Sequence, residues 1–168
     1  GRLWMLNNPQ SQLFENIKVR GEDVYYIETE QTEEFIKISS PEELKICDPA
    51  CGSGHILLYA FDLLYDIYEE EGYESKEIPK LILEKNLYGI EVDERAGELA
   101  AFALVMKARE KYRRFLRKPV QPHICVLQNI SFEEGELKTY IDEIGADLFT
   151  VNLQKTLYQF EEADNFGS

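Results

Sequence analysis

Few residues in this chain suit a metal site, a disulfide framework or a membrane span. The 168 residues include three cysteines, with no CxxC pair, and two histidines that stand far apart. These numbers argue against disulfide bonds, a zinc site and a histidine metal cluster, and they fit a reducing cytoplasm. No apolar run approaches the roughly 20 residues of a membrane-spanning helix, and the start of the chain lacks the features of a secretory signal. We therefore expect a cytoplasmic protein with no resident metal ion and no membrane contact.

Positive charge is also scarce. The chain has 18 basic and 32 acidic residues, which gives a formal net charge of −14. The electric field of such a negative net charge repels a polyanion at long range, so this chain alone should not supply the main binding surface for nucleic acid. Residues 107–118 are an exception, because basic residues dominate there. This stretch is either a solvated helix end whose cations complement the helix dipole or a phosphate contact, and we favour the helix end.

The length and composition fit a single soluble globular domain. Hydrophobic residues make up 44% of the chain, aromatic residues 12% and charged residues 30%, which argues against wholesale disorder. Residues 1–43 give weak signals: a short helix near residues 13–17, and either short strands or an irregular arm at residues 24–27 and 35–38. We expect residues 1–43 to form an N-terminal arm or helical lead-in, and residues 44–168 to carry the domain.

From residue 44 onward, strand and helix signals alternate. We expect strands at residues 44–48, 87–93, 124–127 and, more weakly, 147–151, and helices at residues 56–68, 79–85, 94–111 and 137–144. In the helix over residues 94–111, the apolar positions are Leu99, Phe102, Ala103 and Met106, at the spacing of one helix face. The alternation predicts an α/β fold, a mostly parallel sheet with helices on both faces. In such folds the ligand binds beyond the carboxyl ends of the strands.

A glycine-rich turn, DPACGSG, joins the first of these strands to its helix. Its members are Asp48, Pro49, Ala50, Cys51, Gly52, Ser53 and Gly54. The two glycines let the backbone turn sharply and approach a ligand at the helix start. A dinucleotide fingerprint would need a third glycine where Leu57 stands. Asp48 suits a cationic ligand better than a pyrophosphate, and S-adenosylmethionine carries a sulfonium and an ammonium but no phosphate.

A second carboxylate ends the next strand. Glu91 is an acceptor-only group that could receive both ribose hydroxyls of such a ligand, and Val92 could lie against its adenine. Each feature also has a plain structural explanation, because Asp-Pro is common in turns and either Glu91 or Asp93 could cap the next helix. Their order on consecutive strand ends favours a ligand site. We expect Cys51 to fill a small pocket and His55 to occupy an ordinary first-turn position.

These motifs resemble a known family. DPACGSG looks like motif I of the DNA adenine-N6 methyltransferases, and GIEVD at residues 89–93 resembles their following acidic motif. The wider run is similar to the large single-chain methylases of bacterial defence, the BREX phage-exclusion methyltransferases and fused restriction-modification enzymes. The likeness covers residues 1–118 well and the remainder loosely. It implies a class I S-adenosylmethionine-dependent methyltransferase fold, with residues 44–168 as a partial cofactor-binding domain.

The resemblance also implies roles for single residues. It places the methionine part of the cofactor against the turn of Asp48, Pro49, Ala50, Cys51, Gly52, Ser53 and Gly54, the ribose on Glu91 and the adenine beside Val92. The family's third cofactor contact is an acid after the third strand, and Asn129 stands at the matching place. An uncharged amide would make that contact weaker.

The sequence departs from the family at the catalytic motif. Family members carry Asn-Pro-Pro-Tyr after the fourth strand, where it holds and stacks a base that has been rotated out of the duplex. Here Asn152 is followed by Leu153-Gln154-Lys155. Either the motif is degenerate or it lies beyond residue 168. We favour the second alternative, since residues 153–160 are more typical of a helix and the chain stops abruptly, and we assign no catalytic residue.

The resemblance therefore predicts the cofactor half of a site-specific DNA adenine-N6 methyltransferase. Alone it should not methylate, because the base-binding motif and much of the DNA-contacting surface lie outside it. The intact protein would meet double-stranded DNA, and could meet other defence-system subunits, through regions outside this segment. Two alternatives stay open at this point. The protein could methylate RNA, protein or a small molecule, or it could be a non-catalytic interaction module that kept the fold.

Overall fold

A three-stranded parallel sheet forms the centre of the computed structural model, which describes residues 1–13, 15, 35–128 and 139. The strand order is β1-β2-β3, with β1 at Ile46–Asp48, β2 at Leu87–Glu91 and β3 at His123–Val126. Ile46 lies opposite Leu87, and Tyr88 lies opposite His123. The three main predicted strands and their parallel pairing are thereby confirmed. The predicted fourth strand and the helix over residues 137–144, apart from Thr139, lie outside the described residues.

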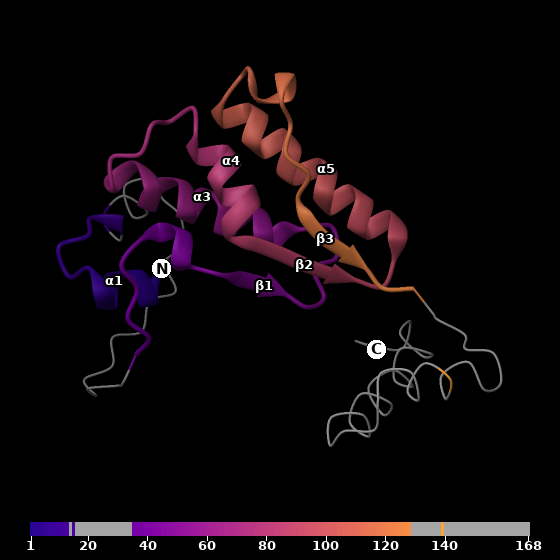
Figure 1. Cartoon of the computed structure of the whole chain (residues 1–168), viewed down its shortest axis with the longest axis horizontal. Helices are drawn as coiled ribbons and strands as arrows, with labels where there is room; N and C mark the ends of the chain where they lie inside the picture. Colours follow the sequence, from indigo (N-terminus) through magenta and orange to yellow (C-terminus); the bar gives the residue numbers. More distant parts are fainter. Residues whose placement is uncertain (14, 16–34, 129–138, 140–168) are drawn as a thin grey trace.

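Three helices cover one face of this sheet (Figure 1). They are α3 at His55–Glu70, α4 at Ile78–Lys85 and α5 at Glu94–Lys111, and they confirm the predicted helices within a few residues. Shorter elements are α1 at Arg2–Asn7, η1 at Pro41–Glu43 and η2 at Phe115–Arg117. We expected helices on both faces, but within the described ranges the opposite face is uncovered. It presents Cys47, Tyr88, Ile90, His123 and Cys125.

The core lies between the sheet and the helices. Its large, almost fully buried members include Leu57, Phe61, Leu64 and Tyr68 of α3, Ile78, Ile82 and Leu83 of α4, Leu87 of β2 and Leu104 of α5. A smaller cluster of Trp4, Leu13 and Ile67 joins α1 to α3. Burial of apolar area at about 25 cal/mol per Å² is the main force that holds such layers together. No helix in the described ranges has the length and apolar character needed to cross a membrane.

The buried face of α5 is not the one that we expected. Leu99, Phe102 and Met106 are 53%, 61% and 38% exposed. The helix instead buries Gly97, Ala100, Leu104 and Ala108, which have the same helical spacing. Three of these four residues are small, so α5 lies close to the sheet and to α3. The face of α5 that is buried is therefore the one that lets the helix backbone approach its neighbours closely, and not the one with the largest apolar side chains.

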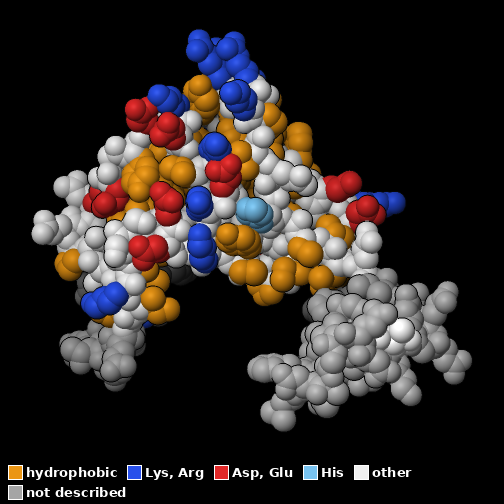
Figure 2. Space-filling model, in the orientation of Figure 1, with side chains coloured by type: hydrophobic (Ala, Val, Ile, Leu, Met, Phe, Trp, Pro, Cys, Tyr) orange, Lys and Arg blue, Asp and Glu red, His pale blue; other side chains and the backbone are white. Residues whose placement is uncertain are grey.

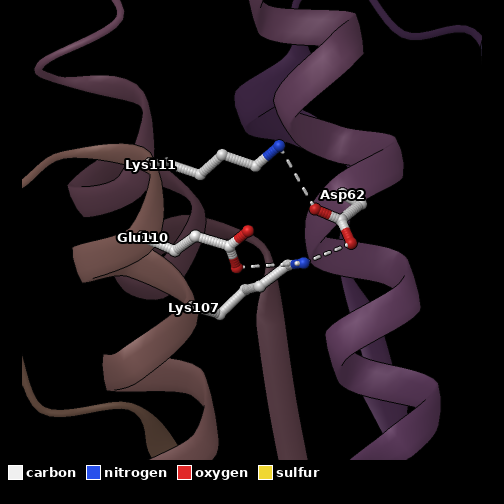
Figure 3. A network of polar contacts seen from close by, with 4 residues as sticks. All are labelled: Asp62, Lys107, Glu110 and Lys111. Atoms are coloured by element: carbon white, nitrogen blue, oxygen red, sulfur yellow. Dashed lines mark ion pairs between the residues drawn. The ribbon is translucent and has the colours of Figure 1, made fainter.

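Ion pairs align α3 with α5 (Figure 3). Asp62 of α3 accepts from Lys107 of α5 at 2.7 Å and lies 3.4 Å from Lys111, and Lys107 also meets Glu110 at 3.5 Å. Burial opposes the charge of Lys107, but the hydrogen bond from its ammonium group to Asp62 and the charge of Asp62 raise its pKa above the ordinary value. Because all these groups are partly exposed, the pairs set the alignment of the two helices more than they stabilise the fold.

Of the two alternatives for residues 35–38, a short strand or an irregular arm, the structure shows the irregular arm. This segment has no regular structure and is held by the side chain of Asn7, whose amide donates to the Ile36 carbonyl at 3.0 Å and accepts from the Ile38 backbone N–H at 3.2 Å. The Asn7 side chain of α1 thus supplies the backbone hydrogen bonds that a neighbouring strand would supply in a sheet. The other predicted strand of this region, at residues 24–27, lies outside the described residues.

A buried asparagine ties the segment before β1 to the core. Asn86 is fully buried, and its amide nitrogen donates to the carbonyl oxygens of Pro41 and Leu44, each at 2.8 Å. Its amide oxygen accepts from the Tyr68 hydroxyl at 2.9 Å. Burial raises the pKa of Tyr68 well above its ordinary value, which keeps the hydroxyl protonated as a donor. Every polar atom of the Asn86 side chain therefore has a partner, and these bonds fix where β1 begins.

Loss of this network should destabilise the protein. Asn86→Ala removes three hydrogen bonds and leaves the Leu44 carbonyl and the Tyr68 hydroxyl without their Asn86 partner, whereas the Pro41 carbonyl keeps its bond from the Leu44 N–H. We expect the free energy of unfolding to fall by about 3 kcal/mol. Tyr68→Phe removes one bond only and should cost about 1 kcal/mol. Urea denaturation measures both, with the exposed Gln121→Ala as a neutral control. Equal losses for all three variants would contradict this role of Asn86.

Candidate functional site

The glycine-rich turn stands at the carboxyl end of β1, where it leads into α3. Gly52 and Gly54 have positive φ values of 53° and 87°, which residues with a Cβ rarely adopt. At Gly54 a Cβ would also meet Ala100 of α5 at 3.0 Å. At Gly52 a Cβ would have no atom within 4 Å. Gly54 therefore serves packing, whereas Gly52 borders open space that a ligand can enter.

Two hydrogen bonds hold the turn against the end of β2. The backbone N–H of Cys51 donates to the Ile90 carbonyl at 3.0 Å. The backbone N–H of Gly52 donates to Oε2 of Glu91 at 2.6 Å. We expected the turn and Glu91 to act at one site, and the structure brings them into direct contact. The Ile90 carbonyl is a backbone group, so no sequence signal points to it.

Glu91 is held by three backbone N–H groups. Oε1 accepts from Val92 at 2.9 Å and from Asp93 at 3.0 Å, and Oε2 accepts from Gly52. The N–H groups of Asp93, Gly52 and Val92 lower the pKa of Glu91 below its ordinary value, against the opposing effects of burial and of the Asp93 charge. Glu91 is therefore an ionised acceptor at neutral pH, in a fixed position at the edge of the sheet.

Asp93 has the capping role that we considered for both carboxylates. It is the N-cap of α5, and its Oδ1 accepts from the backbone N–H groups of Arg95 at 2.8 Å and Ala96 at 3.3 Å. Such a cap contributes about 1 kcal/mol to a helix. Glu91 bonds only residues before the helix. Asp93 thus has a structural function, whereas Glu91 remains available to the open side, with Val92 beside it 36% exposed.

Asp48 contributes a second carboxylate at the same sheet edge. It is 9% exposed, and its Oδ1 accepts from the backbone N–H of Ala50 at 3.2 Å. Its Oδ2 is buried and has no hydrogen-bond partner among the described residues. A buried carboxylate oxygen without a partner carries a desolvation penalty. A donor supplied by a ligand would remove that penalty.

The remaining turn residues divide by exposure. Pro49 and Ala50 are exposed, Ser53 is partly exposed, and Cys51 is only 6% exposed and packs in the core. Burial, followed by the charges of Glu91 and Asp48, raises the pKa of the Cys51 thiol. The thiol therefore stays protonated at neutral pH and is a poor nucleophile.

Three further residues complete the comparison with the sequence analysis. His55 is the first residue of α3 and is exposed, as expected. Asn129 and Asn152 lie outside the described residues. Within the ranges that the structure does describe, no three His, Cys, Asp or Glu side chains come together as ligands for a metal ion.

The lowered pKa of Glu91 gives a pH-dependent prediction. Its stabilising hydrogen bonds need the ionised form, so their contribution is complete above the unfolded pKa, near 4.5, and is lost as the pH falls through the lower pKa of the folded state. The difference in unfolding free energy between wild type and Glu91→Gln should therefore be constant from pH 7 to 5 and shrink below that range. Urea denaturation at each pH measures this, with the exposed Glu94→Gln as control. A difference that stays unchanged down to pH 3 would contradict the assignment.

Comparisons with known proteins agree with this geometry. Residues 28–123 match the family model described as MmeI, DNA-methyltransferase domain. The chain is similar to the adenine-specific methyltransferase BrxX of Escherichia coli O9:H4 (strain HS), with 42% identity over 151 residues, 84% of this chain and 12% of that protein. It is also similar to the adenine-specific methyltransferase PglX of Lacticaseibacillus casei (strain Zhang), with 38% identity over 127 residues, 76% of this chain and 10% of that protein. The chain thus spans about a tenth of the length of these relatives. Since the family model covers more than half of its residues, the chain belongs to the family of MmeI-type DNA-methyltransferase domains.

Proposed function

We propose that this chain is the S-adenosylmethionine-binding part of a DNA adenine-N6 methyltransferase of bacterial defence, with a class I methyltransferase fold. The observation that carries the proposal is the 2.6 Å contact between the backbone of Gly52 and the carboxylate of Glu91, beside open space. The strand order β1-β2-β3 with parallel pairing supports the fold. In this proposal residues 44–168 form the cofactor-binding part, and residues 1–43 lead into it.

The turn suits the methionine part of the cofactor. S-adenosylmethionine supplies an electrophilic methyl group on a sulfonium when it is bound. The unpaired Oδ2 of Asp48 would accept a hydrogen bond from its ammonium group. The open space beside Gly52 lets the ligand approach the backbone without a Cβ in the way. Pro49, Ala50, Ser53 and Gly54 would shape this surface, and the buried Cys51 supports it from below.

Glu91 suits the ribose, with one restriction that the hydrogen bonds impose. A carboxylate has about four acceptor positions, and three of them already receive backbone N–H groups. One hydroxyl therefore fits without rearrangement. A second hydroxyl would displace the Gly52 N–H from Oε2, so cofactor binding would loosen the turn from β2 at this point. Val92 would pack against the adenine, and Asn129 would accept from the adenine amino group.

The choice of DNA adenine as the acceptor is supported by the names of the relatives and of the family model. The intact protein would bind double-stranded DNA mainly through regions outside this segment, alone or with other subunits of a defence system. Within it, the described residues bind and orient the methyl donor. Alignment of donor and acceptor is worth several powers of ten in rate, so orientation is the main contribution of this part.

Cofactor titration by calorimetry on the intact protein tests the proposed pocket. Glu91→Ala should weaken S-adenosylmethionine binding at least about tenfold, since it removes a charged acceptor. Gly52→Leu should abolish binding, because the leucine side chain would occupy the open space. Gly52→Ala introduces the same backbone strain but a shorter side chain, so it should bind the cofactor more tightly than Gly52→Leu does. Glu94→Ala is the control for Glu91→Ala. Equal affinity in all four variants would contradict the placement of the cofactor.

A second measurement separates the enzyme from the other candidates. Transfer of a labelled methyl group from S-adenosylmethionine to unmethylated duplex DNA, with N6-methyladenine as the product, would support the proposal. Cofactor binding without transfer to DNA would favour a methyltransferase of RNA or protein when those substrates accept the label. It would favour a non-catalytic module when no substrate does.

A further inference from the structure

The basic residues of this acidic chain are concentrated at one place. Seven of its 18 lysines and arginines fall within residues 107–118, together with a single acidic residue, Glu110. In the structure this stretch is the end of α5 and the following η2. Basic side chains gather at the top of the body in Figure 2, over the end of α5. The chain therefore has a local positive surface in spite of its net charge of −14.

Local interactions account for only three of these seven cations. Lys107 and Lys111 pair with Asp62, and Arg109 lies with Lys111 in the last turn of α5, where a cation complements the helix dipole. The dipole effect fades within that turn. Four cations come after the end of the helix: Arg113, Arg114, Arg117 and Lys118. We call residues 113–118 the basic loop.

The four cations of the basic loop have no partner in the described part of the chain. Each is exposed, and their side chains form no hydrogen bond or ion pair there. The loop itself is firmly held. Phe115 is 4% exposed and belongs to the core, and backbone bonds join Phe115 to Tyr112, Arg117 to Arg114 and Lys118 to Phe115. The cations thus stand on a fixed support, which reduces the ordering entropy that a partner must overcome.

We propose that the basic loop contacts the phosphate backbone of duplex DNA. Three of the four cations are arginines, whose planar fork matches phosphate geometry. Leu116 is the single exposed large apolar side chain of the loop, whereas the centre of a protein interface is apolar and aromatic. These features favour a polyanion over an acidic protein surface. The proposal rests on the proposed function, which makes DNA the substrate.

The distance between the basic loop and Glu91 determines the role that a DNA contact at the loop can have. α5 has 18 residues, so its two ends are about 27 Å apart. The N-terminal end of α5 lies next to Glu91 in the chain, and the basic loop follows its C-terminal end. The loop therefore contacts DNA away from the cofactor, and a phosphate contact at that distance positions the duplex without reading its sequence.

The test is the salt dependence of DNA binding by the intact protein with S-adenosylmethionine present, followed by fluorescence anisotropy of a labelled duplex. The double variant Arg113→Gln/Arg114→Gln should bind about tenfold or more weakly near 0.1 M salt. The slope of log K against log salt should decrease by about one to two, since each lost phosphate contact removes about 0.9. Arg113→Lys/Arg114→Lys should keep most of the slope, because the charge remains.

The matched control is Lys37→Gln/Lys80→Gln, which removes the same charge from exposed sites outside residues 113–118. It should leave the affinity within about twofold of wild type. Equal affinity and equal slope in the two Gln doubles would overturn the proposal. Lower thermal stability of the Arg double with unchanged DNA binding would overturn it too, and would assign these arginines to a contact within the intact protein. Cofactor affinity is measured for each variant, so failure of the proposed function, seen as absence of cofactor binding by wild type, is distinguished from failure of this inference.

Discussion

The contact between the Gly52 backbone and the Glu91 carboxylate is the constraint on which the site depends. It joins the turn after β1 to the end of β2 across 39 positions of sequence, and it requires a residue at Gly52 that tolerates a positive φ. The same contact keeps Glu91 ionised and oriented. A ligand that takes over this carboxylate would therefore act on the turn at the same time, so in the proposed function recognition of the two halves of the cofactor is coupled through one hydrogen bond.

The surrounding fold serves to hold these two strand ends in register. Parallel pairing places Asp48 opposite Gly89, so the carboxyl ends of β1 and β2 meet at one edge. Close packing of Gly54 on Ala100 brings the starts of α3 and α5 together, and the ion pairs of Asp62 align the two helices further along. At the opposite edge of the sheet, where the strands begin, Asn86 fixes the segment that leads into β1. The basic loop follows the far end of α5, so the proposed cofactor site and the basic loop lie at opposite ends of one helix.

The sequence predicts the elements better than the surfaces that they bury. Alternating strand and helix signals identify β1 and β2 because these strands are short apolar runs that lead into glycine or acidic residues, and β3 because its apolar run follows Pro119 and Pro122. The spacing on α5 is ambiguous, because Leu99, Phe102 and Met106 follow the same period as the small residues that are buried, and only the close approach to neighbouring elements decides between them. At the site, Glu91 and the turn can be identified from residue types, whereas the Ile90 carbonyl and the three N–H groups around Glu91 depend on backbone geometry that no residue type encodes.

A crystal structure of the intact protein with S-adenosylhomocysteine bound would test the central claim most directly. We expect the ribose hydroxyls within hydrogen-bond distance of the Glu91 carboxylate, the amino group of the ligand next to Asp48, and the ligand lying over Gly52 with the Gly52 N–H released from Oε2. A ligand bound elsewhere, with the hydrogen bond between Gly52 and Glu91 intact and Asp48 still without a donor, would contradict the account.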